Sequence, residues 1–301
     1  QTAVWRDFNN DGWIDLFIGN ESNINNSDLH PCELYMSNRN GTFTNIAAKA
    51  GVHVIDYVKG VTAGDFNNDG WSDIFISAMS GKHYLLQNEG SKNESLQFKD
   101  VTQKAGLDSA IGGTFTTWFW DYDNDGWLDI FTCDYEFSRP LSDYAAKEIL
   151  HLQRPGDNTG KPYLFHNNHD GTFTNIAPGT GLFTTTFSMG GNFGDLNNDG
   201  FPDAYLGTGN ISYKSVIPNK MFLNLGGKNF TDITSASRTG NLQKGHSVSI
   251  ADLDNDGDKD IFIEVGGAFP GDAYQNALYV NNLSAENNWI SISLTGVSSN
   301  R

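Results

Sequence analysis

One nine-residue phrase occurs five times in this chain and constrains its fold more than any other feature. The copies are DFNNDGWID from Asp7, DFNNDGWSD from Asp65, DYDNDGWLD from Asp121, DLNNDGFPD from Asp195 and DLDNDGDKD from Asp252. Successive copies begin 58, 56, 74 and 57 residues apart. A second phrase keeps the same register and begins at Leu34, Tyr84, Tyr163, Met221 and, more loosely, Ala277. Two phrases in one register indicate five copies of one structural unit.

The length of the unit predicts its architecture. About 57 residues accommodate four short strands with their turns, which is the size of one propeller blade. An apolar stretch such as Lys59–Ala63 precedes each acidic phrase, and a β-rich run such as DIFIS from Asp73 follows it. We therefore predict an all-β fold, a β-propeller of four-stranded blades over residues 1–286. The repeats lie around 1–56, 57–111, 112–184, 185–243 and 244–286.

The spacing between the two phrases shows where the units differ. The second-to-third-strand connection varies most in length, and in an up-and-down blade it lies on the face opposite the acidic phrase. The insertion in the third unit includes SDYAAKEILHL, for which Ser142 as an N-cap and the following RPG predict a short surface helix over Ser142–Leu152. Residues 287–301 are expected to form the last strand or to begin a further domain.

The acidic phrases have the ligand spacing of calcium loops. Positions 1, 3, 5 and 9 provide side-chain oxygens, position 7 provides a backbone carbonyl, and the glycine at position 6 permits a sharp turn. The predicted ligands are Asp7, Asn9, Asp11, Trp13 and Asp15; Asp65, Asn67, Asp69, Trp71 and Asp73; Asp121, Asp123, Asp125, Trp127 and Asp129; Asp195, Asn197, Asp199, Phe201 and Asp203; and Asp252, Asp254, Asp256, Asp258 and Asp260. An EF-hand would continue into a helix, whereas these loops are followed at once by β-rich runs.

Five copies of the pattern argue against simple Asp/Asn/Gly turns. We predict about five Ca²⁺ ions, one per loop, and expect calcium to be needed for stability because each loop gathers mutually repelling carboxylates. The four aromatic residues at position 7 could stack on sugars, although packing between blades is the simpler interpretation.

The charge of the chain excludes several classes of partner. It has 36 acidic residues against 19 Lys and Arg, a formal charge of −17, whereas nucleic acids and anionic membranes require clustered positive charge. No apolar run approaches the ~20 residues needed to span a bilayer. The two cysteines, Cys32 and Cys133, are too few for a zinc cluster, and they are either one disulfide or two buried thiols.

These repeats resemble the FG-GAP/VCBS family, whose calcium-loop blades also form integrin α-chain propellers. The form DxNNDGWxDIF with LYxNxxGTFTxIAxxAGL, followed by NNWISISLTGVSSNR over Asn287–Arg301, is similar to the ASPIC/UnbV, cartilage acidic protein-like group. The resemblance implies a secreted or cell-surface protein, and weak extracellular calcium sites fill where calcium is millimolar. Integrin-like propellers have seven blades, so five units imply a smaller ring or blades outside this sequence.

Three functions are compatible with the sequence. We expect a recognition, adhesion or assembly module that binds a protein, a glycan or copies of itself. An architectural subunit of an extracellular layer or filament is the first alternative. The second is the propeller of a polysaccharide lyase, for which His151, Arg154 and Lys161 are the available basic residues. The familiar catalytic motifs are missing, so we do not expect an enzyme. His166 and His169, in a predicted hairpin turn, are expected to be solvated.

Overall fold

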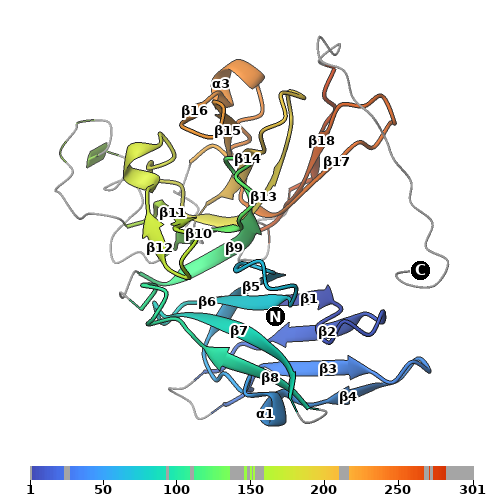
Figure 1. The fold of residues 1–301 in the computed structure, drawn as a ribbon. Helices are drawn as coiled ribbons and strands as arrows, with labels where there is room; N and C mark the ends of the chain where they lie inside the picture. The colour runs from blue at the N-terminus through green and yellow to red at the C-terminus, as the bar shows by residue number, and fades with distance from the viewer. Residues whose placement is uncertain are drawn as a thin grey trace.

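Five antiparallel sheets follow one another along the chain in a propeller arrangement (Figure 1). The computed structural model describes residues 2–23, 28–92, 95–108, 112–135, 159–209, 217–267 and 274–282, together with residues 146, 147, 150, 152 and 271. The predicted all-β propeller is confirmed, and the sheets follow the five predicted repeats.

Each sheet is built from strands that are consecutive in the sequence. The first contains β1 (Thr2–Arg6), β2 (Asp15–Gly19), β3 (Glu33–Ser37) and β4 (Phe43–Asn45). The second contains β5 (Val58–Gly64), β6 (Asp73–Ala78), β7 (His83–Lys92) and β8 (Ser95–Asp100). The third contains β9 (Thr114–Trp120), β10 (Asp129–Asp134), β11 (Pro162–Asn167) and β12 (Phe173–Asn175). The fourth contains β13 (Ser188–Gly194), β14 (Asp203–Thr208), β15 (Lys220–Asn224) and β16 (Phe230–Asp232). The fifth contains β17 (Gly245–Ala251), β18 (Asp260–Val265) and β19 (Ala277–Tyr279), and residues 283–301 lie outside the described residues.

Short helices follow the fourth strands of the first, third and fourth blades. They are α1 (Ala47–Ala50), the 3-10 turn η2 (Ala177–Gly179) and α3 (Thr234–Ser237). Most of the predicted helix over Ser142–Leu152 lies outside the described residues, although the Leu150 amide donates to the Ala146 carbonyl at 2.9 Å, a helical spacing. The predicted last strand or further domain over residues 287–301 also lies outside them.

The second strand of an inner blade is apolar on both faces because a neighbouring blade covers each side. All six residues of β6 are buried, and Ile74 and Ile76 face the first blade while Phe75 faces the third. A strand buried on both faces reads as a continuous apolar run rather than as an alternating one. The repeated DIFI-type runs therefore position one blade against the next.

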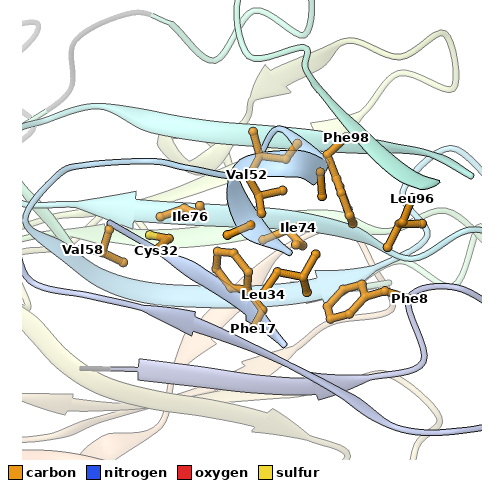
Figure 2. Close-up of a cluster of buried hydrophobic side chains, with 13 residues drawn as sticks. Phe8, Phe17, Cys32, Leu34, Val52, Val58, Ile74, Ile76, Leu96 and Phe98 are labelled. Atoms are coloured by element: carbon orange, nitrogen blue, oxygen red, sulfur yellow. The ribbon is translucent and has the colours of Figure 1, made fainter. Parts of the chain in front are cut away.

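The core is divided into clusters between adjacent blades. Between the first two blades, Phe17 and Leu34 pack against Val58, Ile74 and Ile76, as Figure 2 shows. Cys32 belongs to this cluster and Cys133 to the cluster between the third and fourth blades, so the two cysteines are separate buried thiols. Burial raises the pKa of the Cys32 thiol to about 11, which keeps it protonated at neutral pH.

The inner strands of successive blades pack closely, from β1 and β5 through to β13 and β17. At Gly60 an added Cβ would lie 2.6 Å from the Phe115 carbonyl oxygen, so glycine is needed for this approach. Within the described residues, no comparable packing joins β17 to β1. Accordingly, Trp5 on β1 is 57% exposed and Phe262 on β18 is 38% exposed.

Candidate functional site

Each acidic phrase forms the loop between the first and second strands of its blade. The strand order places all five loops at one end of the blades, and the second-to-third-strand connections leave from the other end, as predicted. Within each loop, the asparagine at position 4 and the glycine at position 6 have positive φ angles. In the first loop these are 55° at Asn10 and 85° at Gly12. Two left-handed residues so close together curl the chain and direct side chains inward.

The aspartate at position 1 organises the turn. In the first loop, Oδ1 of Asp7 accepts the Asp11 amide at 3.1 Å and Oδ2 accepts the Gly12 amide at 2.8 Å. The same pair of bonds recurs in the other four loops. This side chain therefore lies inside the curl, as a ligand at position 1 must.

The side chains at positions 3 and 5 also turn inward. Carboxylate oxygens of positions 1, 3 and 5 lie within 4.8 Å of one another in the third loop (Asp121, Asp123, Asp125) and the fifth loop (Asp252, Asp254, Asp256). The other loops have asparagine at position 3, and in the first loop Nδ2 of Asn9 donates to Asp11 Oδ2 at 3.1 Å. The structure therefore brings together the side chains at positions 1, 3 and 5.

The aspartate at position 9 lies at the base of each loop and is buried. Asp15 is 1% exposed, and its carboxylate accepts the amides of Phe8 at 3.0 Å and Ser37 at 2.8 Å. Burial raises the pKa of Asp15 to about 6, of Asp203 to about 7, and of Asp73 and Asp129 to about 8. Among the described residues, a position-9 carboxylate lies within 4.8 Å of two other potential ligands only in the third loop, where Asp129 is grouped with Asp123 and His166. The role of position 9 as a ligand therefore stays a prediction.

The position-7 tryptophans of the second and third loops pack against their own blades. Trp127 stacks on His169 at 4.8 Å between ring centroids, and Trp71 covers Gly90. Trp13 is 47% exposed, whereas Asp258, in the fifth loop, is buried and accepts a hydrogen bond from Asn198 at 2.8 Å. Whether the carbonyls at this position bind metal stays a prediction.

Two recurrent asparagines were missed in the sequence analysis. The position-4 asparagine donates from Nδ2 to the glycine carbonyl of the next loop, from Asn10 to Gly70 at 2.9 Å and from Asn68 to Gly126 at 3.0 Å. Asn124 and Asn198 continue the series at 2.8 and 3.4 Å. A recurrent NN at positions 3 and 4 was the available signal.

The second missed asparagine ends the third strand. Asn167 donates to the carbonyl of Phe66, in the preceding blade, at 2.8 Å, and Asn224 does the same to Tyr122 at 2.7 Å. Its signal was the recurrent Asn after the third apolar run. These bonds tie each loop to its neighbours, so the five loops form one connected face.

Three basic side chains at the end of a third strand or in the turn that follows it also contact the loops. Arg39 pairs with Asp11 at 2.8 Å, and His169 Nε2 lies 2.6 Å from Asp125 Oδ2. His166 Nδ1 lies 3.2 Å from Asp129 Oδ1. The sequence analysis expected these two histidines to be solvated. Both also contact carboxylates of the third loop.

The residues of the loops fit a hard divalent cation. Their inward side chains are carboxylate and amide oxygens, the ligands that Ca²⁺ takes. In the third loop, Oδ1 of Asp123 is buried without a hydrogen-bond partner among the described residues. A buried carboxylate oxygen without a partner is costly unless a positive charge compensates it.

The fold and these loops define a class of protein, a β-propeller with an acidic hairpin loop in every blade. The family model described as "FG-GAP-like repeat" matches residues 7–76, 65–132, 149–206 and 210–263. The chain therefore belongs to the FG-GAP-like repeat family. The resemblance inferred from the sequence is confirmed.

Curated relatives share the repeats at modest identity. Over 197 residues the chain is 27% identical to "Cartilage acidic protein 1" of Xenopus tropicalis and of Homo sapiens, which is 65% of this chain and 26% of each relative. The chain thus spans about a quarter of the length of these relatives. Among solved structures, the Vibrio cholerae biofilm matrix protein Bap1 matches with a TM-score of 0.48 and 14% identity, over 94% of this chain and 39% of that one.

Proposed function

We propose that this chain is a calcium-binding extracellular β-propeller that recognises a protein or glycan partner. The observation that carries the calcium part is the arrangement of acids repeated in all five loops. Every loop folds its position-1 carboxylate inward and buries its position-9 carboxylate at the base. Acidic clusters of this kind are unfavourable without a compensating cation.

The loops already have the conformation that such a cation requires. When bound, Ca²⁺ supplies positive charge at the centre of each loop. The backbone amides at positions 5, 6 and 7 hold the carboxylates in place before binding. The hydrogen bonds of the position-4 asparagines connect each of these loops to the next one. Binding therefore stabilises the blade interfaces as well as the single loops.

The names of the matched relatives and the affinity expected of such calcium sites support an extracellular location. The matched relatives are named cartilage acidic proteins. Among the described residues, no helix is long and apolar enough to cross a membrane. Calcium sites of extracellular modules often bind at 10⁻⁴–10⁻³ M and fill where calcium is millimolar.

We place the partner site on the face opposite the loops, where the connections vary. A cavity of about 500 Å³ there is lined by Glu21, Asp28, Asp56, Tyr57 and Ser80, among others. Tyr57 is 42% exposed, and the Lys59 ammonium lies 4.4 Å from the centre of its ring. An ordered aromatic ring beside carboxylates suits a sugar or a basic peptide.

The calcium proposal is tested by thermal unfolding with and without EGTA. We expect EGTA to lower the melting temperature by several degrees, because ligand binding to the folded state alone stabilises it. A melting temperature that does not change on chelation would contradict the proposal.

The partner proposal is tested by retention of the calcium-loaded protein on neutral and acidic polysaccharides and on basic peptides. Tyr57→Ala should weaken retention without changing the melting temperature. Phe43→Ala, at an aromatic residue that is 41% exposed and follows the turn between β3 and β4, is the matched control and should bind normally. Equal loss of binding in both variants would contradict the assignment of the face.

Exposed apolar groups favour an architectural subunit as the second function. Trp5 and Phe43 contact edge-to-face on the first blade at 57% and 41% exposure, and Leu278 on the last is 52% exposed. Concentration-dependent assembly would support this function. Of the three basic residues considered for a lyase, Lys161 is 3% exposed and lies over the ring of Phe183 at 4.3 Å, which argues against its use on a polysaccharide. His151 and Arg154 lie outside the described residues. We therefore propose a non-catalytic role, and shortening of a polysaccharide would overturn it.

A further inference from the structure

The third loop differs from the other four in having a histidine beside it. His166 precedes Asn167 at the end of β11, and Gln87 precedes Asn88 at the equivalent place in the second blade. The same place is occupied by Met36, Leu223 and Val280 in the other blades. The third loop also has aspartate at position 3, whereas the first, second and fourth have asparagine.

The histidine and two loop carboxylates converge on one point. Nδ1 of His166 lies 3.2 Å from Asp129 Oδ1 and 3.7 Å from Asp123 Oδ2. The ligand atoms of the three residues all lie within 4.8 Å of one another. They come from three places in the chain, the loop itself, the start of β10 and the end of β11, so folding assembles the group.

The contacts of Nδ1 are long for hydrogen bonds and close to the spacing of ligands around one metal ion, although Asp129 Oδ1 also accepts the Asn167 amide at 2.8 Å. The third neighbour of Nδ1, the Tyr122 hydroxyl, is 3.5 Å away, so none of the three contacts has the 2.7–2.9 Å length of a charge-assisted hydrogen bond. His169, by comparison, approaches Asp125 to 2.6 Å. Two ligands of a tetrahedral ion with bonds of about 2.0–2.1 Å are about 3.3–3.4 Å apart.

The next blade covers one side of Asp123. An added Cβ on Gly227, in the turn between β15 and β16, would lie 2.7 Å from Cα and Cβ of Asp123. Under this cover, Asp123 Oδ1 is buried and has no hydrogen-bond partner among the described residues. Because Asp123 belongs to this group of potential ligands, a cation bound there would compensate its buried carboxylate oxygen.

We propose that the third loop, with His166 as an additional ligand, binds a first-row transition-metal ion such as Zn²⁺ in preference to Ca²⁺. Imidazole nitrogen is a ligand for zinc and its neighbours, whereas Ca²⁺ takes oxygen ligands. The inference rests on the proposed metal role of the loops and gives one of them a different ion. The other four loops have Met36, Gln87, Leu223 and Val280 at the histidine position, none of them an imidazole, and keep calcium.

The test uses Co²⁺ as a visible probe for the zinc site, with the whole chain in millimolar calcium. We expect one equivalent of Co²⁺ to give a visible absorption band that Zn²⁺ abolishes. His166→Gln, which introduces the residue of the second blade, should weaken Co²⁺ binding about tenfold or more. Asp123→Asn should do the same, while His53→Gln, at an exposed histidine remote from the loops, should leave it unchanged.

A complementary variant transfers the site to the second blade. Asn67→Asp combined with Gln87→His should add a second equivalent of Co²⁺, and unchanged stoichiometry would count against the inference. Undiminished Co²⁺ binding in His166→Gln would overturn the zinc-site inference. It would also be overturned if the wild-type protein gave no Co²⁺ absorption band while calcium still raised its melting temperature. Failure of the general calcium proposal is seen separately, as a melting temperature that does not respond to EGTA.

Discussion

The side-chain amide of Asn88 donates a hydrogen bond across the first blade interface to the carbonyl of Phe8, at 2.9 Å. It donates a second to the carbonyl of Ser72, at 3.1 Å, while its own oxygen accepts the Gly90 amide at 3.0 Å. Asn88 is fully buried. One side chain therefore satisfies backbone groups of two loops that are about sixty residues apart in sequence.

Asn88→Ala should destabilise the protein by about 3 kcal/mol, because it leaves buried backbone groups without partners. The measurement is urea unfolding in the presence of calcium. Asn38→Ala is the matched control, since Asn38 is exposed and bonds within its own hairpin turn. We expect the control to change stability by about 0.5 kcal/mol or less. Equal effects of the two substitutions would show that the inter-blade bond is unimportant.

The buried position-9 acids predict how stability without calcium depends on pH. The pKa values of Asp73 and Asp129 are raised to about 8 and that of Asp203 to about 7 by burial, from 3.8. Folding then binds protons between about pH 4 and 8, so stability falls as pH rises through this window. Glu21 and Asp232 have lowered pKa values, so the stability that they contribute is lost only when the pH falls below this window.

Melting temperatures in EGTA should therefore decrease from about pH 4.5 to pH 8.5. The increase on adding calcium should grow over the same range, because ionised carboxylates bind the cation. Asp73→Asn should flatten the profile in EGTA, since the amide does not titrate. A melting temperature in EGTA that rises with pH would contradict this account.

Removing the carboxylate at position 1 of one loop should reduce the number of calcium ions bound by one. In the second loop, Asp65 accepts the amides of Asp69 and Gly70 as well as serving as a predicted ligand. For Asp65→Ala, we expect calorimetry to show one equivalent of calcium fewer than in the wild type. The calcium-dependent stabilisation should fall by about 1.4 kcal/mol when calcium is about ten times Kd. Asp108→Ala removes an exposed acid outside the loops and should leave the stoichiometry intact.

The sequence predicted the blades and the inward carboxylates because both depend on local spacing. Position 1 reaches the amides at positions 5 and 6, and position 9 begins the next strand, so nine residues contain that geometry. Phe8, which accepts a hydrogen bond from Asn88, and Gly70, the partner of Asn10, lie in other blades, and no local pattern identifies them. The position of His166 beside Asp123 likewise depends on the pairing of β10 with β11. Whether β17 packs against β1 depends on the angle between blades, which the repeat does not encode.

The position-4 asparagine combines a left-handed backbone with a bond to the next loop, and the two contributions can be separated. Asn124 has a φ of 59° and donates to Gly200 at 2.8 Å. Asn255 has a φ of 64°, and among the described residues its side chain makes no such bond to another loop. Asn124→Gly keeps the backbone conformation and loses the bond, whereas Asn255→Gly changes only the backbone freedom of the chain.

We expect Asn124→Gly to be more destabilising than Asn255→Gly by about 1 kcal/mol, the contribution of one hydrogen bond. Asn124→Ala should cost about 1–2 kcal/mol more than Asn124→Gly, because alanine adopts the left-handed conformation with strain. Urea unfolding of the three variants in calcium measures both differences. If Asn124→Gly and Asn255→Gly are equally stable, the loops are ordered one by one and the asparagine series does not couple them.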